Sequence, residues 1–326
     1  MLVDKYNRNL SYLRISITDR CNLRCRYCAP LTPLTMLSHG EVLNYEEILR
    51  VVKVGVGHGI SKIRVTGGEP LVRRGVYDFL AKLSRIDGVR DISLTTNGVL
   101  LKGNIDKIRS AGVRRINISL DSLDRENFKR ITGKDHFQKV WDGILLALDR
   151  GFDPIKINVV ALRGLNDHEL LNFAELSIKY PLHIRFIEYM PIGKTCVDAS
   201  QQLLTPETRE RISVFGELIP VESGENDGPA FRYRFKNAKG EIGFISPISR
   251  HFCSKCNRLR LTANGRLRSC LLSDDFVDLM PHLRNGCSDE TISELYLETI
   301  KHKRERHSIS FSPDEKVFTQ MSSIGG

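Results

Sequence analysis

Between residues 10 and 188, short β-branched runs alternate with stretches in which apolar residues recur every three or four positions. The short runs predict strands and the longer stretches predict amphipathic helices. This alternation predicts an α/β fold with a parallel sheet and helical crossovers, either open or closed into a full or partial barrel. Six strands are expected, at residues 12–18, 62–66, 91–95, 115–120, 156–161 and 183–188.

Helix signals separate these strands. Asn44 precedes Glu47 and Asn166 precedes Glu169, and each pair predicts an N-cap with an acid at the third helical position. One further helix is expected to bury a single apolar face. That face would consist of Phe137, Val140, Trp141, Ile144, Leu145 and Leu148.

The pattern changes after residue 221. A polar segment with glycine and proline occupies residues 221–229 and predicts a linker. A hairpin is expected at 231–236 and 241–245, before a cysteine-bearing segment at 251–270. We therefore divide the chain into a core (1–222) and a C-terminal extension (223–326).

Composition narrows the class of protein. The 326 residues are 41% hydrophobic and contain no long apolar run, and the start carries Asp4, Lys5 and Arg8 instead of an apolar signal region, so a cytoplasmic location without a membrane partner is expected. The formal charge of +10 attracts anions of any kind, from nucleic acid to phosphorylated small molecules. Eight cysteines in a reducing compartment favour metal ligands over disulfides.

Three of these cysteines, Cys21, Cys25 and Cys28, follow the first expected strand. Iron–sulfur clusters are usually held by four thiolates, so three leave one iron open to a ligand. An open position is typical of catalytic metal sites. The alternative is a zinc site completed by His39 or a distant cysteine.

The expected strands end in residues that suit a binding site, because ligands of parallel α/β folds lie at the carboxyl ends of strands. The second strand runs into Gly67-Gly68-Glu69-Pro70. These glycines either form a tight turn or let the backbone approach a ligand, whose ammonium would donate to Glu69 or a nearby carbonyl.

A second cysteine group comprises Cys253, Cys256 and Cys270. It is either part of a zinc ribbon, with His251 or Cys287 as fourth ligand, or a second open cluster. Arg258 and Arg260 alternate with leucines, which places both on one side of a strand. Paired guanidiniums there suit a bidentate grip on phosphate.

The C-x3-C-x2-C spacing with Tyr27 before the last cysteine, together with the Gly-Gly-Glu-Pro turn, resembles the radical S-adenosylmethionine superfamily. The resemblance implies that the open iron binds S-adenosylmethionine, whose reductive cleavage yields a 5′-deoxyadenosyl radical. The residues expected around S-adenosylmethionine are Tyr27, Gly68, Glu69, Ser119 and Met190.

Over nearly the whole chain the sequence is similar to the GTP 3′,8-cyclase branch of that superfamily, including the second cysteine group and the terminal Gly325-Gly326. This similarity implies a partial (βα)6 barrel closed by the C-terminal segment, with a 4Fe-4S cluster at each end of its cavity and GTP at the second. The tail is expected to enter the active site, whereas Cys196 and Cys287 are expected to be ordinary thiols. The residues expected near GTP are Arg14, Lys62, Arg64, Thr95, Lys156, Arg185, Arg258 and Arg260.

The same branch implies the first step of molybdenum cofactor biosynthesis. A reducing protein would donate electrons, the cyclic pyranopterin monophosphate synthase would act next, and the enzyme would form a homodimer. One alternative is another radical enzyme with an auxiliary cluster. A zinc-bearing RNA-binding protein is disfavoured because aromatic residues, at 7%, are too few for a base-stacking surface, so no nucleic acid partner is expected.

Overall fold

The computed structural model describes residues 1–28, 36–193, 195–222, 228–307, 309 and 317–325. Within them, twelve strands form one sheet in the order β12-β11-β10-β1-β2-β3-β4-β5-β6-β9-β8-β7. Strands β1 to β6 pair in parallel, and the two end strands of the sheet do not pair with each other, so the predicted partial barrel is confirmed. The six strands are β1 (Tyr12–Ser16), β2 (Lys62–Thr66), β3 (Asp91–Thr96), β4 (Arg115–Ser119), β5 (Ile155–Ala161) and β6 (Leu182–Glu188).

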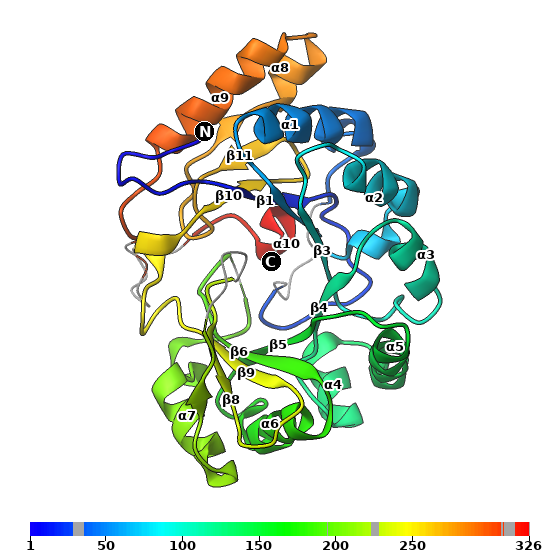
Figure 1. Ribbon diagram of the computed structural model, residues 1–326, viewed down its shortest axis with the longest axis vertical. Helices are drawn as coiled ribbons and strands as arrows, with labels where there is room; N and C mark the ends of the chain where they lie inside the picture. The colour runs from blue at the N-terminus through cyan, green and yellow to red at the C-terminus, as the bar shows by residue number, and fades with distance from the viewer. Residues whose placement is uncertain (29–35, 194, 223–227, 308, 310–316, 326) are drawn as a thin grey trace.

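Helices cover the outer side of this curved sheet (Figure 1). Successive strand residues point to opposite faces, and one face of each strand is apolar, with Leu13, Ile63 and Ile184 fully buried. The other face carries polar side chains and is turned towards the middle of the barrel. The covering helices are α1 (Tyr45–Gly57), α2 (Val76–Ser84), α3 (Ile105–Ser110), α4 (Arg125–Thr132), α5 (Phe137–Asp149), α6 (Leu170–Lys179) and α7 (Thr205–Ile212).

The first predicted N-cap is confirmed. The Asn44 side chain accepts from Glu47 N (2.8 Å), and the Glu47 carboxylate accepts from Asn44 N (2.7 Å). The second is confirmed in position, because Asn166 is the N-cap residue of a 3₁₀ turn, η3 (Asp167–Glu169), that leads into α6. Its side chain makes no capping bond, since its Oδ1 accepts from Leu162 N and its Nδ2 donates to Asp121 O.

Helix α5 buries a narrower face than predicted. Val140 and Ile144 are fully buried, together with Gly143 and Ala147. Leu145, predicted to lie on the same face, is 40% exposed. Small residues rather than leucine occupy the positions closest to the sheet.

The C-terminal region extends both edges of the barrel sheet. The hairpin is confirmed as antiparallel β8 and β9, with β8 ending two residues before its predicted end, and β9 joins β6 in parallel. At the other edge β10 joins β1 in parallel. These strands are β7 (Ile219–Pro220), β8 (Phe231–Arg234), β9 (Glu241–Ile245), β10 (Arg258–Leu261), β11 (Arg266–Arg268) and β12 (Val277–Asp278).

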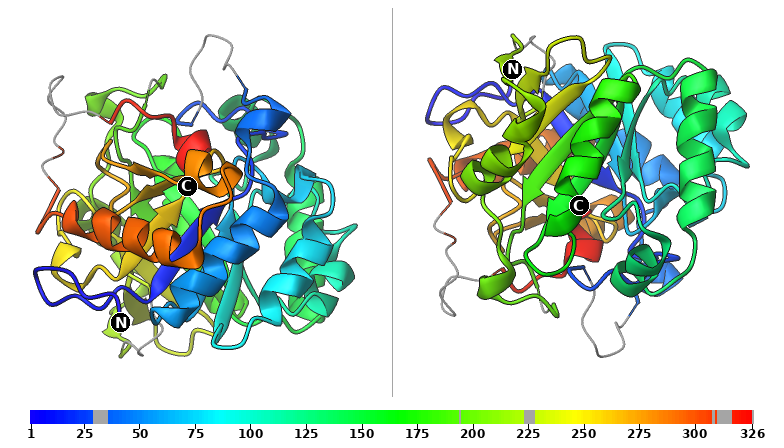
Figure 2. Two further views of the ribbon diagram at one scale, coloured as in Figure 1. Left: turned by 90° about the horizontal axis from the view of Figure 1, so that it is seen from above. Right: turned by 90° about the horizontal axis from the view of Figure 1, so that it is seen from below.

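Three further helices follow: α8 (Met280–Arg284), α9 (Asp289–Lys301) and α10 (Met321–Ile324). Helix α9 packs beside α1 (Figures 1 and 2), where Tyr296 Oη donates to Val51 O at 3.1 Å. Residues 223–227 of the predicted linker lie outside the described residues, and the division at residue 222 stays a prediction. None of the helices in the described ranges is long and apolar enough to cross a lipid bilayer.

The neighbouring residues of α5 provide a matched test of the packing. We expect Ile144→Ala to lower the free energy of unfolding by about 2–5 kcal/mol, because it leaves a cavity under the helix. Leu145→Ala should change it by less than about 0.5 kcal/mol. Urea unfolding followed by circular dichroism measures both, and equal losses would contradict the orientation of α5.

Candidate active site

Both cysteine groups line one cavity of about 660 Å³ in the described part of the chain. The loop after β1 supplies the first group, and the segments flanking β10 and β11 supply the second. The structure thus brings together thiols that are more than 220 residues apart in sequence. The lining cysteines are Cys21, Cys25, Cys28, Cys253, Cys256 and Cys270, whereas Cys196 and Cys287 are not among the lining residues.

Backbone contacts hold the first cysteine loop in place. Arg24 N and Arg26 N donate to carbonyls at the end of α4, at 2.9 and 3.0 Å. Burial raises the pKa of Cys25 well above its usual range and that of Cys28 to about 12, and the charges of Cys21 and Asp121 add to the effect at Cys28. Three thiols that line one cavity from a single loop fit a metal cluster, and coordination to the metal would remove their protons.

Tyr27 and Asp121 form a buried pair beside this loop. Tyr27 Oη donates to Asp121 Oδ2 at 2.6 Å, and Val160 N donates to Asp121 Oδ1 at 2.8 Å. Burial raises the pKa of Asp121 to about 6. Both side chains line the cavity. Sequence reasoning gave Asp121 no role, since its partner Tyr27 is 94 residues away.

The Gly-Gly-Glu-Pro turn is shaped by the protein's own backbone. A Cβ on Gly68 would lie 2.5 Å from Arg20 O, and one on Gly67 would lie 2.7 Å from Thr18 O. The glycines therefore let the cysteine loop pack directly on the turn. Both glycines also line the cavity.

Glu69 is fully buried and is not among the cavity-lining residues. Its carboxylate accepts from Leu71 N (3.1 Å), Thr96 Oγ1 (2.8 Å) and Asn97 N (2.6 Å). Burial nevertheless raises its pKa to about 7. Glu69 thus links the end of β2 to the end of β3. A direct contact between Glu69 and a ligand stays a prediction.

The remaining predicted cofactor residues, Ser119 and Met190, line the cavity. Several buried polar atoms have no hydrogen-bond partner within the described residues. Tyr12 Oη, Thr95 Oγ1 and Asn158 Oδ1 belong to side chains that line the cavity. Because buried polar groups are normally paired, these atoms fit a polar ligand.

Cations dominate one side of the cavity. Arg260, Arg14 and Arg64 lie in register across β10, β1 and β2. Burial, followed by the charge of Arg260, holds the pKa of Arg14 well below its usual range. Like charges gathered in a buried site favour an anionic ligand. The lining arginines of the strands are Arg14, Arg64, Arg185, Arg258 and Arg260.

The two predicted lysines lie behind this layer. Lys62 Nζ pairs with Asp91 Oδ2 at 3.2 Å, and Lys156 is buried; neither is among the lining residues. Burial, followed by the charge of Arg185, lowers the pKa of Lys156 to about 6.

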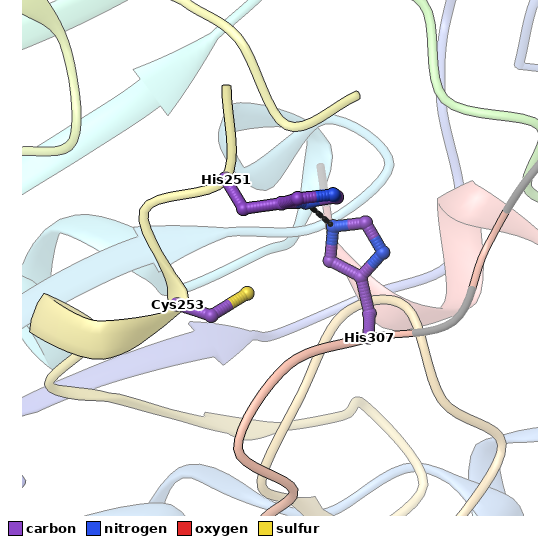
Figure 3. Close-up of side chains that lie close together, drawn as sticks. All are labelled: His251, Cys253 and His307. Atoms are coloured by element: carbon purple, nitrogen blue, oxygen red, sulfur yellow. Dashed lines mark hydrogen bonds between the residues drawn. The ribbon is translucent and has the colours of Figure 1, made fainter. Parts of the chain in front are cut away.

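Two imidazoles accompany the second cysteine group (Figure 3). Donor atoms of His251, Cys253 and His307 lie within 4.8 Å of one another, and His251 Nδ1 is 2.9 Å from His307 Nε2. The structure thus brings the predicted His251 to this group together with His307, which sequence spacing gave no reason to select. Cys287, the other candidate, packs against the hydrophobic core.

The C-terminal tail reaches the cavity wall. Arg260 Nη1 donates to Gly325 O at 3.1 Å, and Met321 lines the cavity. Gly325 is buried at a φ of +81°, and a Cβ there would lie 2.7 Å from Thr66 Cγ2. Gly326 lies outside the described residues.

The chain matches the family model "Radical SAM superfamily" over residues 15–177 and the model "Molybdenum Cofactor Synthesis C" over residues 182–309. With its cysteine loop, glycine turn and partial barrel, the protein belongs to the radical S-adenosylmethionine superfamily. Membership implies a 4Fe-4S cluster that binds S-adenosylmethionine. Within the superfamily the chain belongs to the GTP 3′,8-cyclase family.

Two relatives named GTP 3′,8-cyclase carry that assignment. The protein of Thermodesulfovibrio yellowstonii is 48% identical over 325 residues, covering 99% of each chain. That of Geobacter sulfurreducens is 47% identical over 329 residues, covering 100% of this chain and 99% of the relative. The fold is similar to Streptococcus suis SuiB bound to S-adenosylmethionine, with a TM-score of 0.66, 14% identity, and coverage of 92% of this chain and 70% of that one.

The tail packing predicts that Gly325→Ala opens the C-terminus. A side chain at a positive φ, pressed against Thr66, costs about 1–2 kcal/mol, which raises the open fraction of the tail roughly tenfold. Carboxypeptidase should therefore remove residues 321–326 faster than from the unchanged protein. Gly103→Ala is the control, because a Cβ there meets nothing within 4 Å; equal digestion of both variants would contradict the packing.

Proposed function

We propose that this protein converts GTP to 3′,8-cyclo-7,8-dihydro-GTP, the first step of molybdenum cofactor biosynthesis. The observation that carries the proposal is the convergence of two three-cysteine groups and five strand arginines on one cavity. The names of the full-length relatives support the choice of substrate and reaction.

Cys21, Cys25 and Cys28 would hold one 4Fe-4S cluster, and Cys253, Cys256 and Cys270 a second. Three thiolates leave one iron of each cluster free for a ligand. When loaded, the first site supplies a 5′-deoxyadenosyl radical from S-adenosylmethionine. The hydrogen of ribose C3′ would pass to that radical to give 5′-deoxyadenosine, C3′ would join C8 of guanine, and one electron from the reducing protein with one proton would complete the dihydro product.

The protein's own side chains bind and orient the substrate. A triphosphate carries about four negative charges, and guanidiniums bind phosphate oxygens in bidentate pairs. Arg258 and Arg260 lie on β10, the strand that follows Cys256, while Arg64 and Arg185 lie on barrel strands. Thr95 Oγ1 and Asn158 Oδ1 offer neutral hydrogen-bond partners to the nucleoside.

The walls of the cavity keep water from a reactive centre. Met190, Leu271 and Leu272 supply apolar surface near the second cysteine group, and Met321 brings the tail against the same cavity. Exclusion of water strengthens the arginine–phosphate interactions and prevents side reactions of a radical.

We also propose a cytoplasmic location and a homodimer, as the family implies. We propose that a protein of low reduction potential donates the electrons. The enzyme that acts next on the cyclised nucleotide would be the cyclic pyranopterin monophosphate synthase.

Iron analysis and product analysis test the function together. After anaerobic reconstitution we expect about eight irons per chain, and about four in Cys21→Ser and in Cys253→Ser. Cys21→Ser should abolish formation of 5′-deoxyadenosine. Cys253→Ser should retain S-adenosylmethionine binding while losing the cyclised nucleotide. Cys287→Ser is the control, and zinc as the main metal or cyclisation by Cys21→Ser would refute the proposal.

The lowered pKa of Lys156 predicts proton uptake when GTP binds. In the empty cavity, burial and Arg185 keep this lysine mostly neutral at pH 7. A bound triphosphate offsets the charge of Arg185 and Arg64, so the pKa of Lys156 rises and about one proton is taken up per GTP. Calorimetry in two buffers of different ionisation enthalpy measures this number.

Lys156→Met should abolish the uptake, whereas the exposed Lys129→Met should leave it unchanged. Uptake that persists in Lys156→Met would assign the proton to another group.

A further inference from the structure

Lys303 lies two residues beyond α9 and is only 3% exposed. Its ammonium donates to Ser269 O at 2.7 Å and to Arg258 O at 3.0 Å, and its Nζ lies 3.7 Å from Cys256 Sγ. An ammonium has three donors, and these contacts use all of them.

The three contacts join the parts of the chain that carry the second cysteine group. Arg258 begins β10, two residues after Cys256, and Ser269 immediately precedes Cys270. A single side chain therefore fixes the spacing between two of the three cysteines. Sequence reasoning assigned Lys303 no role.

The charge of Lys303 needs a negative partner, because a buried unpaired ammonium is costly. Among the described residues, no carboxylate lies within salt-bridge distance of it, and two of its contacts are neutral carbonyls. The sulfur of Cys256 is the one contact that becomes an anion. A cysteine binds a metal as its thiolate, so the ammonium of Lys303 would face a negative sulfur at this position.

The first cysteine group differs at Cys21. Among the described residues, Cys21 Sγ accepts from neutral donors, Leu23 N at 3.4 Å and Asn97 Nδ2 at 3.6 Å. An ammonium in contact with the sulfur therefore distinguishes Cys256 from Cys21.

We propose that Lys303 is a positioning residue of the second cysteine group, where its ammonium compensates the Cys256 thiolate and makes a cluster bound there easier to reduce. Hydrogen bonds and positive charge near cluster sulfurs stabilise the added electron and so raise the reduction potential. This inference rests on the second cluster of the proposed function.

The test isolates the second cluster in a full-length chain that carries Cys21→Ser, Cys25→Ser and Cys28→Ser. Into this chain we introduce Lys303→Gln, the charge-preserving Lys303→Arg, or the exposed control Lys301→Gln. After anaerobic reconstitution, iron content and the midpoint potential are measured, the latter by redox titration with electron paramagnetic resonance.

We expect a more negative midpoint potential in Lys303→Gln, a return towards the original value in Lys303→Arg, and no shift in Lys301→Gln. An unshifted potential in Lys303→Gln would overturn the inference. If Lys303→Gln loses the cluster, retention by Lys303→Arg supports a role of the charge, whereas loss from both would overturn it.

A failure of the proposed function has a different signature. The chain without the first three cysteines, but with Lys303 intact, would then bind no iron after reconstitution. That result would overturn the second cluster and this inference with it, before any variant of Lys303 is compared.

Discussion

Repulsion among buried cations is the constraint on which this structure depends. The barrel strands turn apolar residues such as Ile63 and Ile184 towards the helices, so their polar residues face the cavity. Arg14, Arg64 and Arg260 stand in one register row there, and burial depresses the pKa of each. Such a row of like charges is unfavourable until an anion binds beside it. The arrangement of these arginine side chains therefore depends on the bound anion.

The two cysteine groups differ in the charged residues that surround them. Near the first group lie the carboxylates of Asp121 and Glu69, which suits a centre that gives up an electron. Near the second lie Lys303 and the arginines of β10, which suits the second cluster and the polyphosphate that we propose there. The two cysteine groups therefore have different electrostatic surroundings, and the difference arises from residues other than the cysteines.

Local patterns predicted the barrel well, because strand and helix periodicity are encoded within a few residues. The six core strands and the cap at Asn44 are examples. The differences arose where distant contacts prevail: the Asn166 side chain donates to Asp121 O and makes no bond to the turn that it precedes, and Leu145 faces solvent while Gly143 and Ala147 lie on the packed face. Such partners are set by the tertiary fold.

In the candidate site, too, features with a local sequence signal were predicted and features set by distant contacts were missed. Cysteine spacing and the glycine turn carry their own signals, so their place at the cavity could be predicted. His307 and Lys303 carry none, because each contacts the second cysteine group only after α9 has returned the chain to it.

The tail forms part of the cavity wall. Arg260 donates to the carbonyl of Gly325, which is a neutral acceptor, so this contact adds no negative charge beside the guanidinium. Only a residue without a side chain fits there, since a Cβ would press on Thr66 and Ser16. Tail residues packed against the cavity reduce the access of water, and exclusion of water would strengthen the phosphate binding that we propose.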